Sequence, residues 1–166
     1  MYSLNVPVPG EVARLAEELR PSLHRFDTVR NRRTLVVKRF GNHGNYDRLE
    51  MRVRTALVGE PAFEARISGL DYFEHPARGA GPVVYLAVES PGLRALHREL
   101  VAEFDRIEGL EGEDYVPHVT LARGGSLDVA RRLAERDVDP VAWNVTRLQL
   151  WDATYEEPAA TISLPA

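Results

Sequence analysis

The sequence predicts an α+β fold in which a duplicated unit forms two lobes, with two antiparallel-type sheets facing a central cleft and helices on the outer faces. Three observations support this prediction. Residues 4–10 and 86–92 share the pattern Leu-x-Val-x-x-Pro-Gly. An amphipathic helical pattern follows each segment, and a strand rich in β-branched and aliphatic residues follows each helix. Because the elements recur in the same order, we interpret the chain as a single domain, 1–166, with lobes of roughly 1–78 and 79–166.

The helices are predicted from apolar residues that recur three and four positions apart. After each Pro-Gly pair, which punctuates a strand, one face of the following segment is apolar. The first helix presents Val12, Leu15, Ala16 and Leu19, and its counterpart presents Leu93, Leu96, Leu100, Val101 and Phe104. Two more helices are predicted at about 46–57 and 126–135, where leucine, valine and alanine recur at the same spacing.

Strands are predicted between these helices. The middle strand of each unit is 34–37 in the first half and 118–121 in the second, both rich in β-branched residues. The third strand is residues 63–69, which alternate apolar and polar, and its counterpart is Trp143 to Trp151. The two middle strands are expected to meet near a pseudo-twofold axis, where a cleft between lobes favours a ligand site.

Composition excludes several classes of protein. Hydrophobic residues make up 44% and charged residues 28% of the 166 positions, as in ordinary globular proteins. The absence of cysteine excludes disulfides and thiolate nucleophiles. The apolar runs are too short to span a membrane, and residues 1–4 show no export leader, so a cytoplasmic protein is expected. A net charge of −4 argues against indiscriminate binding of nucleic acid.

The strand at 118–121 carries the clearest candidate chemistry. Alternate residues of a strand share a face, so His118 and Thr120 point to one side while Val119 and Leu121 point to the other. Such a strand buries its apolar face and lines a cleft with the polar one. Histidine moves protons near neutral pH, and a threonine hydroxyl donates a hydrogen bond to a phosphoryl oxygen.

Residues 115–123, Tyr-Val-Pro-His-Val-Thr-Leu-Ala-Arg, closely resemble the second signature motif of the 2H phosphoesterase superfamily, the 2′,5′ RNA ligase-like proteins. Residues 63–73 and 83–88 resemble the strands that follow the family's first motif. The resemblance implies a two-lobed α+β fold with one His-x-Thr motif in each half. It also implies a phosphodiesterase that acts on 2′,3′-cyclic or 2′,5′-linked RNA ends or nucleotides, without a metal or other cofactor. His118 and Thr120 would then be catalytic.

The first motif departs from this pattern. Aligning Thr34 with Thr120, as the motif threonine, places Arg32 opposite His118, and a slip of one residue places Arg33 there instead. Arginine has a pKa above about 12 and cannot serve as a general base or acid near neutrality. Its guanidinium can grip a phosphate through two parallel hydrogen bonds. Arg32 and Arg33 are therefore expected to bind phosphate.

Three interpretations remain open. In the first, the protein is a phosphodiesterase that uses His118 alone, with arginine stabilising the charge on the phosphate. In the second interpretation His43, in the loop after the first motif strand, has replaced the missing histidine. In the third, catalysis has been lost and a protein that binds RNA ends or nucleotide phosphates remains. Arg123 at the end of the second motif strand is a third phosphate-binding candidate, and Lys38 and Arg39 end the first one.

Overall fold

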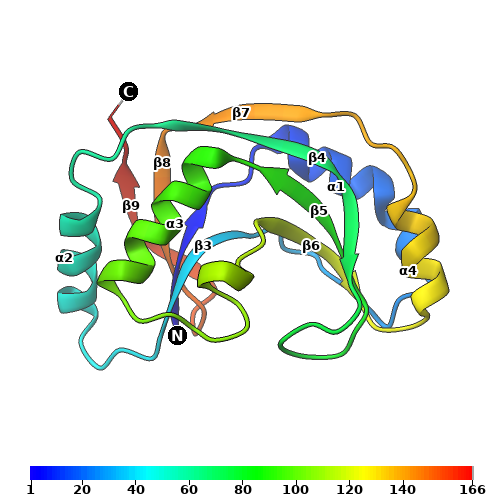
Figure 1. Cartoon of the computed structure of the whole chain (residues 1–166), viewed down its shortest axis with the longest axis horizontal. Coiled ribbons are helices and arrows are strands. Elements are labelled where there is room, and N and C mark those ends of the chain that lie inside the picture. Colours follow the sequence, from blue (N-terminus) through cyan, green and yellow to red (C-terminus); the bar gives the residue numbers. More distant parts are fainter. Residues whose placement is uncertain (166) are drawn as a thin grey trace.

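The computed structural model describes residues 1–165, in which nine strands form two antiparallel sheets (Figure 1). The first sheet has the order β3 (Leu35–Gly41), β1 (Tyr2–Val6), β8 (Arg147–Asp152) and β9 (Glu157–Ser163). The second has the order β2 (Thr28–Val29), β6 (His118–Arg123), β5 (Val83–Glu89), β4 (Phe63–Phe73) and β7 (Val141–Val145). The predicted α+β class with two antiparallel sheets is confirmed.

The third strand of each repeat lies in the sheet of the other repeat. Strand β4 from the first half pairs with β5 and β7, whereas β8 from the second half pairs with β1 and β9. Each sheet therefore combines strands from both sides of the expected lobe boundary near residue 78. That boundary separates the sequence repeats, but it does not separate the sheets.

The segment from Trp143 to Trp151 differs from its prediction as one strand. It forms β7 and β8, which are separated at Thr146 and belong to different sheets. Strands β2 and β9 were not predicted either. A continuous run of strand-forming residues does not show where the chain passes from one sheet to another.

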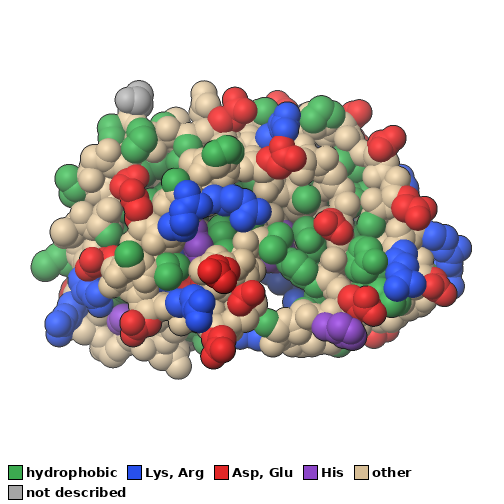
Figure 2. Space-filling model, viewed as in Figure 1, with side chains coloured by type: hydrophobic (Ala, Val, Ile, Leu, Met, Phe, Trp, Pro, Cys, Tyr) green, Lys and Arg blue, Asp and Glu red, His purple; other side chains and the backbone are tan. Residues whose placement is uncertain are grey.

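The four predicted α-helices are present, and their bounds lie close to the apolar patterns. They are α1 (Gly10–Leu19), α2 (Tyr46–Ala56), α3 (Pro91–Glu103) and α4 (Leu127–Ala134). Helices α2 and α4 lie at opposite ends of the molecule, and α3 packs on β3 and β4, one strand from each sheet. Within residues 1–165, no helix combines the length and hydropathy that a membrane span requires. Basic and acidic side chains are interspersed over the face seen in Figure 2.

A buried ion pair joins β3 to the loop that follows α3. The side chains of Lys38 and Glu111 are each 1% exposed, and Lys38 Nζ lies 2.6 Å from Glu111 Oε1. Lys38 also donates to the carbonyl oxygens of Arg39 and Asp105 at 2.6 and 2.9 Å. Glu111 in turn accepts from the backbone N–H groups of Arg39 and Ile107. Because both charges are fully hydrogen-bonded, the pair offsets much of the desolvation that its burial costs.

His97 of α3 extends this network. Its Nδ1 donates to the Val37 carbonyl at 2.7 Å, and its Nε2 accepts from the Gly112 N–H at 3.0 Å, so the ring is a neutral tautomer. Burial lowers the pKa of His97 and favours this form. The ring stacks on Tyr115, whose hydroxyl donates to the Val36 carbonyl at 2.7 Å. The network therefore fastens the loop before β6 to strand β3.

Replacing Glu111 with glutamine should destabilise the fold strongly, because it leaves the Lys38 ammonium buried without its counter-charge. Breaking one side of a buried pair costs about 3–5 kcal/mol, and urea unfolding monitored by circular dichroism measures the loss. Glu50→Gln is the matched control, since its ion pair with Arg54 is solvent-exposed. Equal unfolding midpoints for the two variants would contradict the expectation.

Candidate active site

A cleft of about 500 Å³ lies between the two sheets. Strands β1, β3 and β8 line it from one sheet, and β4, β5 and β6 line it from the other. The remaining lining residues come from connecting loops and a short 3₁₀ turn, so the α-helices cover other surfaces. The two sheets thus create a concave site of the size expected for a small ligand. No group of three or more potential metal-ligating side chains occurs within residues 1–165.

His118 stands in this cleft at the start of β6. Its neighbours Val119 and Leu121 are fully buried on the opposite face of the strand, as the alternation predicts. The imidazole Nδ1 lies 2.6 Å from the Val116 carbonyl oxygen. Since a carbonyl can only accept, Nδ1 carries a proton, and in the neutral ring Nε2 holds the free lone pair. Phe73 packs edge-on against the ring at 5.2 Å.

Burial lowers the pKa of His118, and the nearby guanidinium groups of Arg39, Arg30 and Arg123 lower it further. The hydrogen bond to Val116 acts in the opposite direction but is weaker than burial. At neutral pH the ring is therefore uncharged, which suits a general base rather than a general acid.

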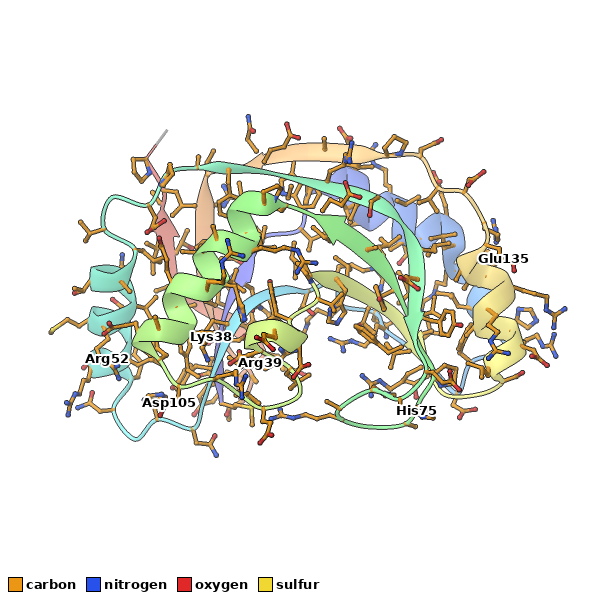
Figure 3. The ribbon with its side chains drawn as sticks, viewed as in Figure 1. Lys38, Arg39, Arg52, His75, Asp105 and Glu135 are labelled. Atoms are coloured by element: carbon orange, nitrogen blue, oxygen red, sulfur yellow. The ribbon has the colours of Figure 1, made fainter. Side chains whose placement is uncertain are left out.

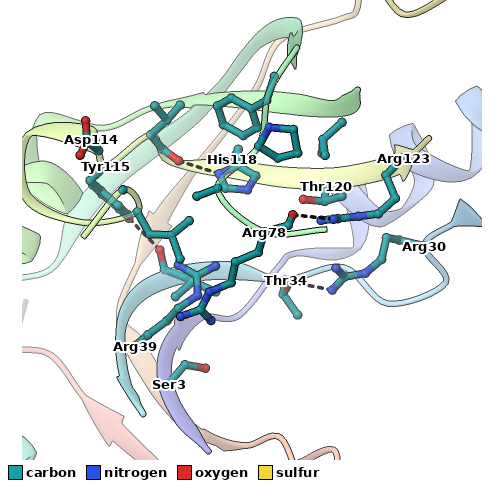
Figure 4. Close-up of a pocket in the computed structure, with 18 of the residues that line it drawn as sticks. Ser3, Arg30, Thr34, Arg39, Arg78, Asp114, Tyr115, His118, Thr120 and Arg123 are labelled. Atoms are coloured by element: carbon teal, nitrogen blue, oxygen red, sulfur yellow. Dashed lines mark hydrogen bonds between the residues drawn. The ribbon is translucent and has the colours of Figure 1, made fainter. Parts of the chain in front are cut away.

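Both predicted threonines also line the cleft. Thr120 lies two residues after His118 on the same face of β6 and is 8% exposed. Thr34 lies immediately before β3 and accepts a hydrogen bond from Arg30 Nη2 at 3.4 Å. The fold therefore brings His118, Thr120 and Thr34 to one site (Figure 4).

The two motif strands support a different equivalence from the one expected from sequence. Strand β3 contains two extra residues where it pairs with β1, Val37 and Phe40, and β6 contains one where it pairs with β5, Leu121. Val37 and Leu121 are each followed by a second buried residue and then by a cleft-lining arginine, Arg39 or Arg123. Superposing Val37 on Leu121 places Thr34, three residues earlier, opposite His118. In this superposition Thr34, and not an arginine, stands at the histidine position of the first motif.

The same superposition pairs two further cleft residues. Val36 takes the place of Thr120, so the first motif lacks both the histidine and the threonine of the second. Arg39 takes the place of Arg123, and both arginines line the cleft. The signal was present in the sequence, because Arg39 follows Thr34 by the same five positions that separate Arg123 from His118.

Arg32 and Arg33, which were expected to bind phosphate at the histidine position, do not line the cleft. Arg32 pairs with Glu156 at 3.4 Å and lies over the ring of Trp151 at 5.2 Å. Arg33 turns the other way and pairs with Glu17 at 3.1 Å. Both precede β3, where the chain has not yet entered the sheet.

His43 does not replace the missing histidine in the cleft. It lines a separate hollow of about 280 Å³, together with Arg52 and Asp105. Figure 3 shows these two residues at the end of the molecule opposite His75. His75 borders the cleft, but its side chain is 90% exposed on the loop between β4 and β5. Lys38 is also absent from the cleft, because it is committed to Glu111.

Four arginines line the cleft, and two of them were missed by sequence reasoning. Arg30 lies before the first motif and Arg78 lies in the loop between β4 and β5, so neither belongs to a recognisable pattern. Arg123 Nη1 donates to the Arg78 carbonyl at 2.9 Å, which fastens that loop to β6. A side chain at Gly79 would collide with the Arg123 guanidinium, which explains the glycine there.

The sequence and the fold are both similar to known proteins. A 91-residue segment is 38% identical to the RNA 2′,3′-cyclic phosphodiesterase of Methanothermobacter thermautotrophicus. The segment covers 53% of this chain and 48% of that protein, so the match spans about half of the curated relative. Escherichia coli LigT complexed with 3′-AMP has a TM-score of 0.72 at 16% identity, covering 99% of this chain and 98% of that one. Thermus thermophilus TT0787 has a TM-score of 0.66 at 22% identity, covering 98% and 97%.

These two structural likenesses concern the fold, which is the two-sheet architecture described above. The family match rests on sequence and extends over residues 8–154, which include both motif strands. The chain therefore belongs to the 2′-5′ RNA ligase superfamily, a family of 2H phosphoesterases.

Proposed function

We propose that the cleft binds 2′,3′-cyclic or 2′,5′-linked phosphodiesters at RNA ends or in small nucleotides and hydrolyses them with His118 as the general base. The observation that carries the proposal is the free Nε2 of a neutral His118 beside Thr120 in a cleft lined by four arginines. Membership of the family and the name of the Methanothermobacter relative support the same chemistry.

In the proposed reaction, His118 Nε2 removes a proton from a water molecule as its oxygen forms a bond to phosphorus. The bond from phosphorus to the ribose oxygen breaks, and that oxygen takes a proton from solvent. Thr120 donates a hydrogen bond to a non-bridging oxygen, and the arginines stabilise the negative charge that builds on the phosphoryl group.

The first motif supplies no group that can protonate the leaving oxygen. Thr34 carries a hydroxyl where a histidine would serve as acid, and Val36 carries no polar group. The absence of one general acid typically lowers a rate by roughly 10²–10⁴. Slow turnover is therefore expected, even when the ligand binds well.

A second candidate function is binding of RNA ends or nucleotide phosphates without turnover. The presence of Thr34 and Val36 in the first motif favours it, since the arginines that grip phosphate remain while half of the proton-transfer machinery is missing. The experiments below separate the two functions.

Removal of His118 should abolish hydrolysis and leave the fold intact. His118→Ala is expected to lose at least about 10²-fold in kcat on a nucleoside 2′,3′-cyclic phosphate. Among residues 1–165, His75 is the only other histidine that borders the cleft, and its side chain is 90% exposed on a loop. His43→Ala serves as the matched control, since its side chain lines another hollow. Equal turnover by both variants, or none by the parent protein at high concentration, would rule out the catalytic proposal.

The dependence of kcat/KM on pH should show a single ascending limb. His118 acts only when neutral, and its pKa is lowered from 6.5, so activity should rise through a value below 6.5 and then stay level. A two-histidine site would instead give a bell, because its acid loses its proton as the pH increases. Steady-state rates measured across the acidic and weakly alkaline range test this. A descending alkaline limb would indicate a second proton-transfer group.

Rebuilding the first motif should restore the missing acid. We expect the double variant Thr34→His/Val36→Thr to raise kcat by roughly 10²–10⁴, the typical contribution of a general acid. Arg32→His is the control, because that side chain points to Glu156 outside the cleft. No gain from the double variant would favour the binding function, and an equal gain from Arg32→His would contradict the register described above.

A further inference from the structure

We propose that Arg39 and Arg78 form a second phosphate subsite, so that the preferred ligand carries two phosphate groups. One is the reacting phosphodiester beside His118. The other is a further phosphate on the same nucleotide or at the junction with the neighbouring one. This inference rests on the proposed function, and it specifies which ligands of that class the cleft selects.

The four arginines of the cleft form two pairs. Arg30 and Arg123 extend toward Thr34 and Thr120, whereas the guanidinium groups of Arg39 and Arg78 lie together on the other side of Thr34 (Figure 4). The electrostatics agree with this grouping. Burial lowers the pKa of Arg30, and Arg123 is the next cause. Burial is also the main cause of the lowered pKa of Arg39, and Arg78 is the strongest of the positive neighbours that lower it.

Arg39 has no side-chain partner of its own. Within residues 1–165, its guanidinium makes no hydrogen bond or ion pair, although the side chain is half-buried. Glu111 is the carboxylate that raises the pKa of Arg39, but its charge is already paired with Lys38. A partly desolvated guanidinium beside a second one costs free energy unless an anion binds between them.

The backbone of β3 directs the side chain of Arg39 into the cleft. Lys38 points into the core, and adjacent residues of a strand face opposite sides, so Arg39 must point into the cleft. The Arg39 N–H donates to Glu111 Oε2 at 2.8 Å, which fixes the strand at this residue. The buried pair of Lys38 and Glu111 therefore holds the positive charge of Arg39 toward the ligand.

The charge of the cleft exceeds what a cyclic phosphodiester can neutralise. Asp114 is the one acidic residue among the lining residues, against four arginines. A 2′,3′-cyclic phosphate carries a single negative charge and occupies the space beside His118 and Thr120. Arg30 and Arg123 suffice to bind this phosphate, because a single guanidinium can form two hydrogen bonds to it. The Arg39–Arg78 pair remains available for a second anion.

The pseudo-symmetry of the strands provides an independent argument. Arg39 and Arg123 occupy equivalent positions in β3 and β6, so each sheet contributes one arginine to the cleft. Equivalent positions around a pseudo-twofold axis lie on opposite sides of it. Arg39 and Arg123 therefore lie on opposite sides of the cleft, which separates the two arginine pairs.

Binding measurements test the subsite without relying on turnover. Three ligands are compared by calorimetry at fixed salt: adenosine 2′,3′-cyclic phosphate, its 5′-phosphorylated form, and a diadenosine dinucleotide that ends in a 2′,3′-cyclic phosphate. All proteins carry His118→Asn, so that hydrolysis does not consume the ligand. The variants are Arg39→Met and the matched control Arg98→Met, whose side chain is exposed on α3. Circular dichroism verifies that both variants are folded.

We expect the second phosphate to tighten binding by about tenfold or more, as one additional charge-assisted contact would. Arg39→Met should remove most of this gain, and Arg98→Met should keep it. A gain with the 5′-phosphorylated mononucleotide supports a terminal phosphate, and a gain with the dinucleotide alone supports an internucleotide phosphate.

Equal affinity for the three ligands, an undiminished gain in Arg39→Met, or failure to bind any of them would overturn the inference. Hydrolysis of the mononucleotide by the protein with His118 intact is measured separately. The proposed function and the second subsite can therefore fail independently of one another.

Discussion

The buried pair of Lys38 and Glu111 is the interaction on which the geometry of the cleft depends. It joins β3, the strand of the first motif, to the loop that leads into β6, the strand of the second. With Lys38 turned into the core, Arg39 is turned into the cleft, and Tyr115 is held against Val36 on the same side. A buried ion pair contributes little net stability compared with apolar packing. Its effect here is to specify how the two motif strands face each other.

Much of the fold could be predicted from sequence because helices and strands leave local patterns. All four α-helices follow the spacing of their apolar residues, and the duplicated order of elements indicated two antiparallel sheets. The exchange of β4 and β8 between the sheets leaves no such pattern, because pairing partners are distant in the chain. The break at Thr146 is hidden for the same reason, since the residues on both sides of it form strands.

The site was predicted less completely than the fold. His118 and Thr120 follow from strand alternation together with the motif, and the structure places both in the cleft. The local match of Thr34 with Thr120 predicts an equivalence two residues away from the one that the cleft supports, in which Arg39 corresponds to Arg123. The match of the extra residues Val37 in β3 and Leu121 in β6 supports this equivalence, and these residues become visible only through the partner strands.

The missing histidine of the first motif and the arginines of the cleft act on different steps of the reaction. The histidine position taken by Thr34 concerns proton transfer, which belongs to the transition state. In the proposed second subsite, Arg39 and Arg78 contact a phosphate whose charge does not change during the reaction. Interactions made equally in the ground state and the transition state strengthen binding without raising kcat. We therefore expect this cleft, with one histidine and four arginines, to bind phosphate esters well and to hydrolyse them slowly. Its affinity for phosphate esters and its rate of hydrolysis should respond to separate sets of residues.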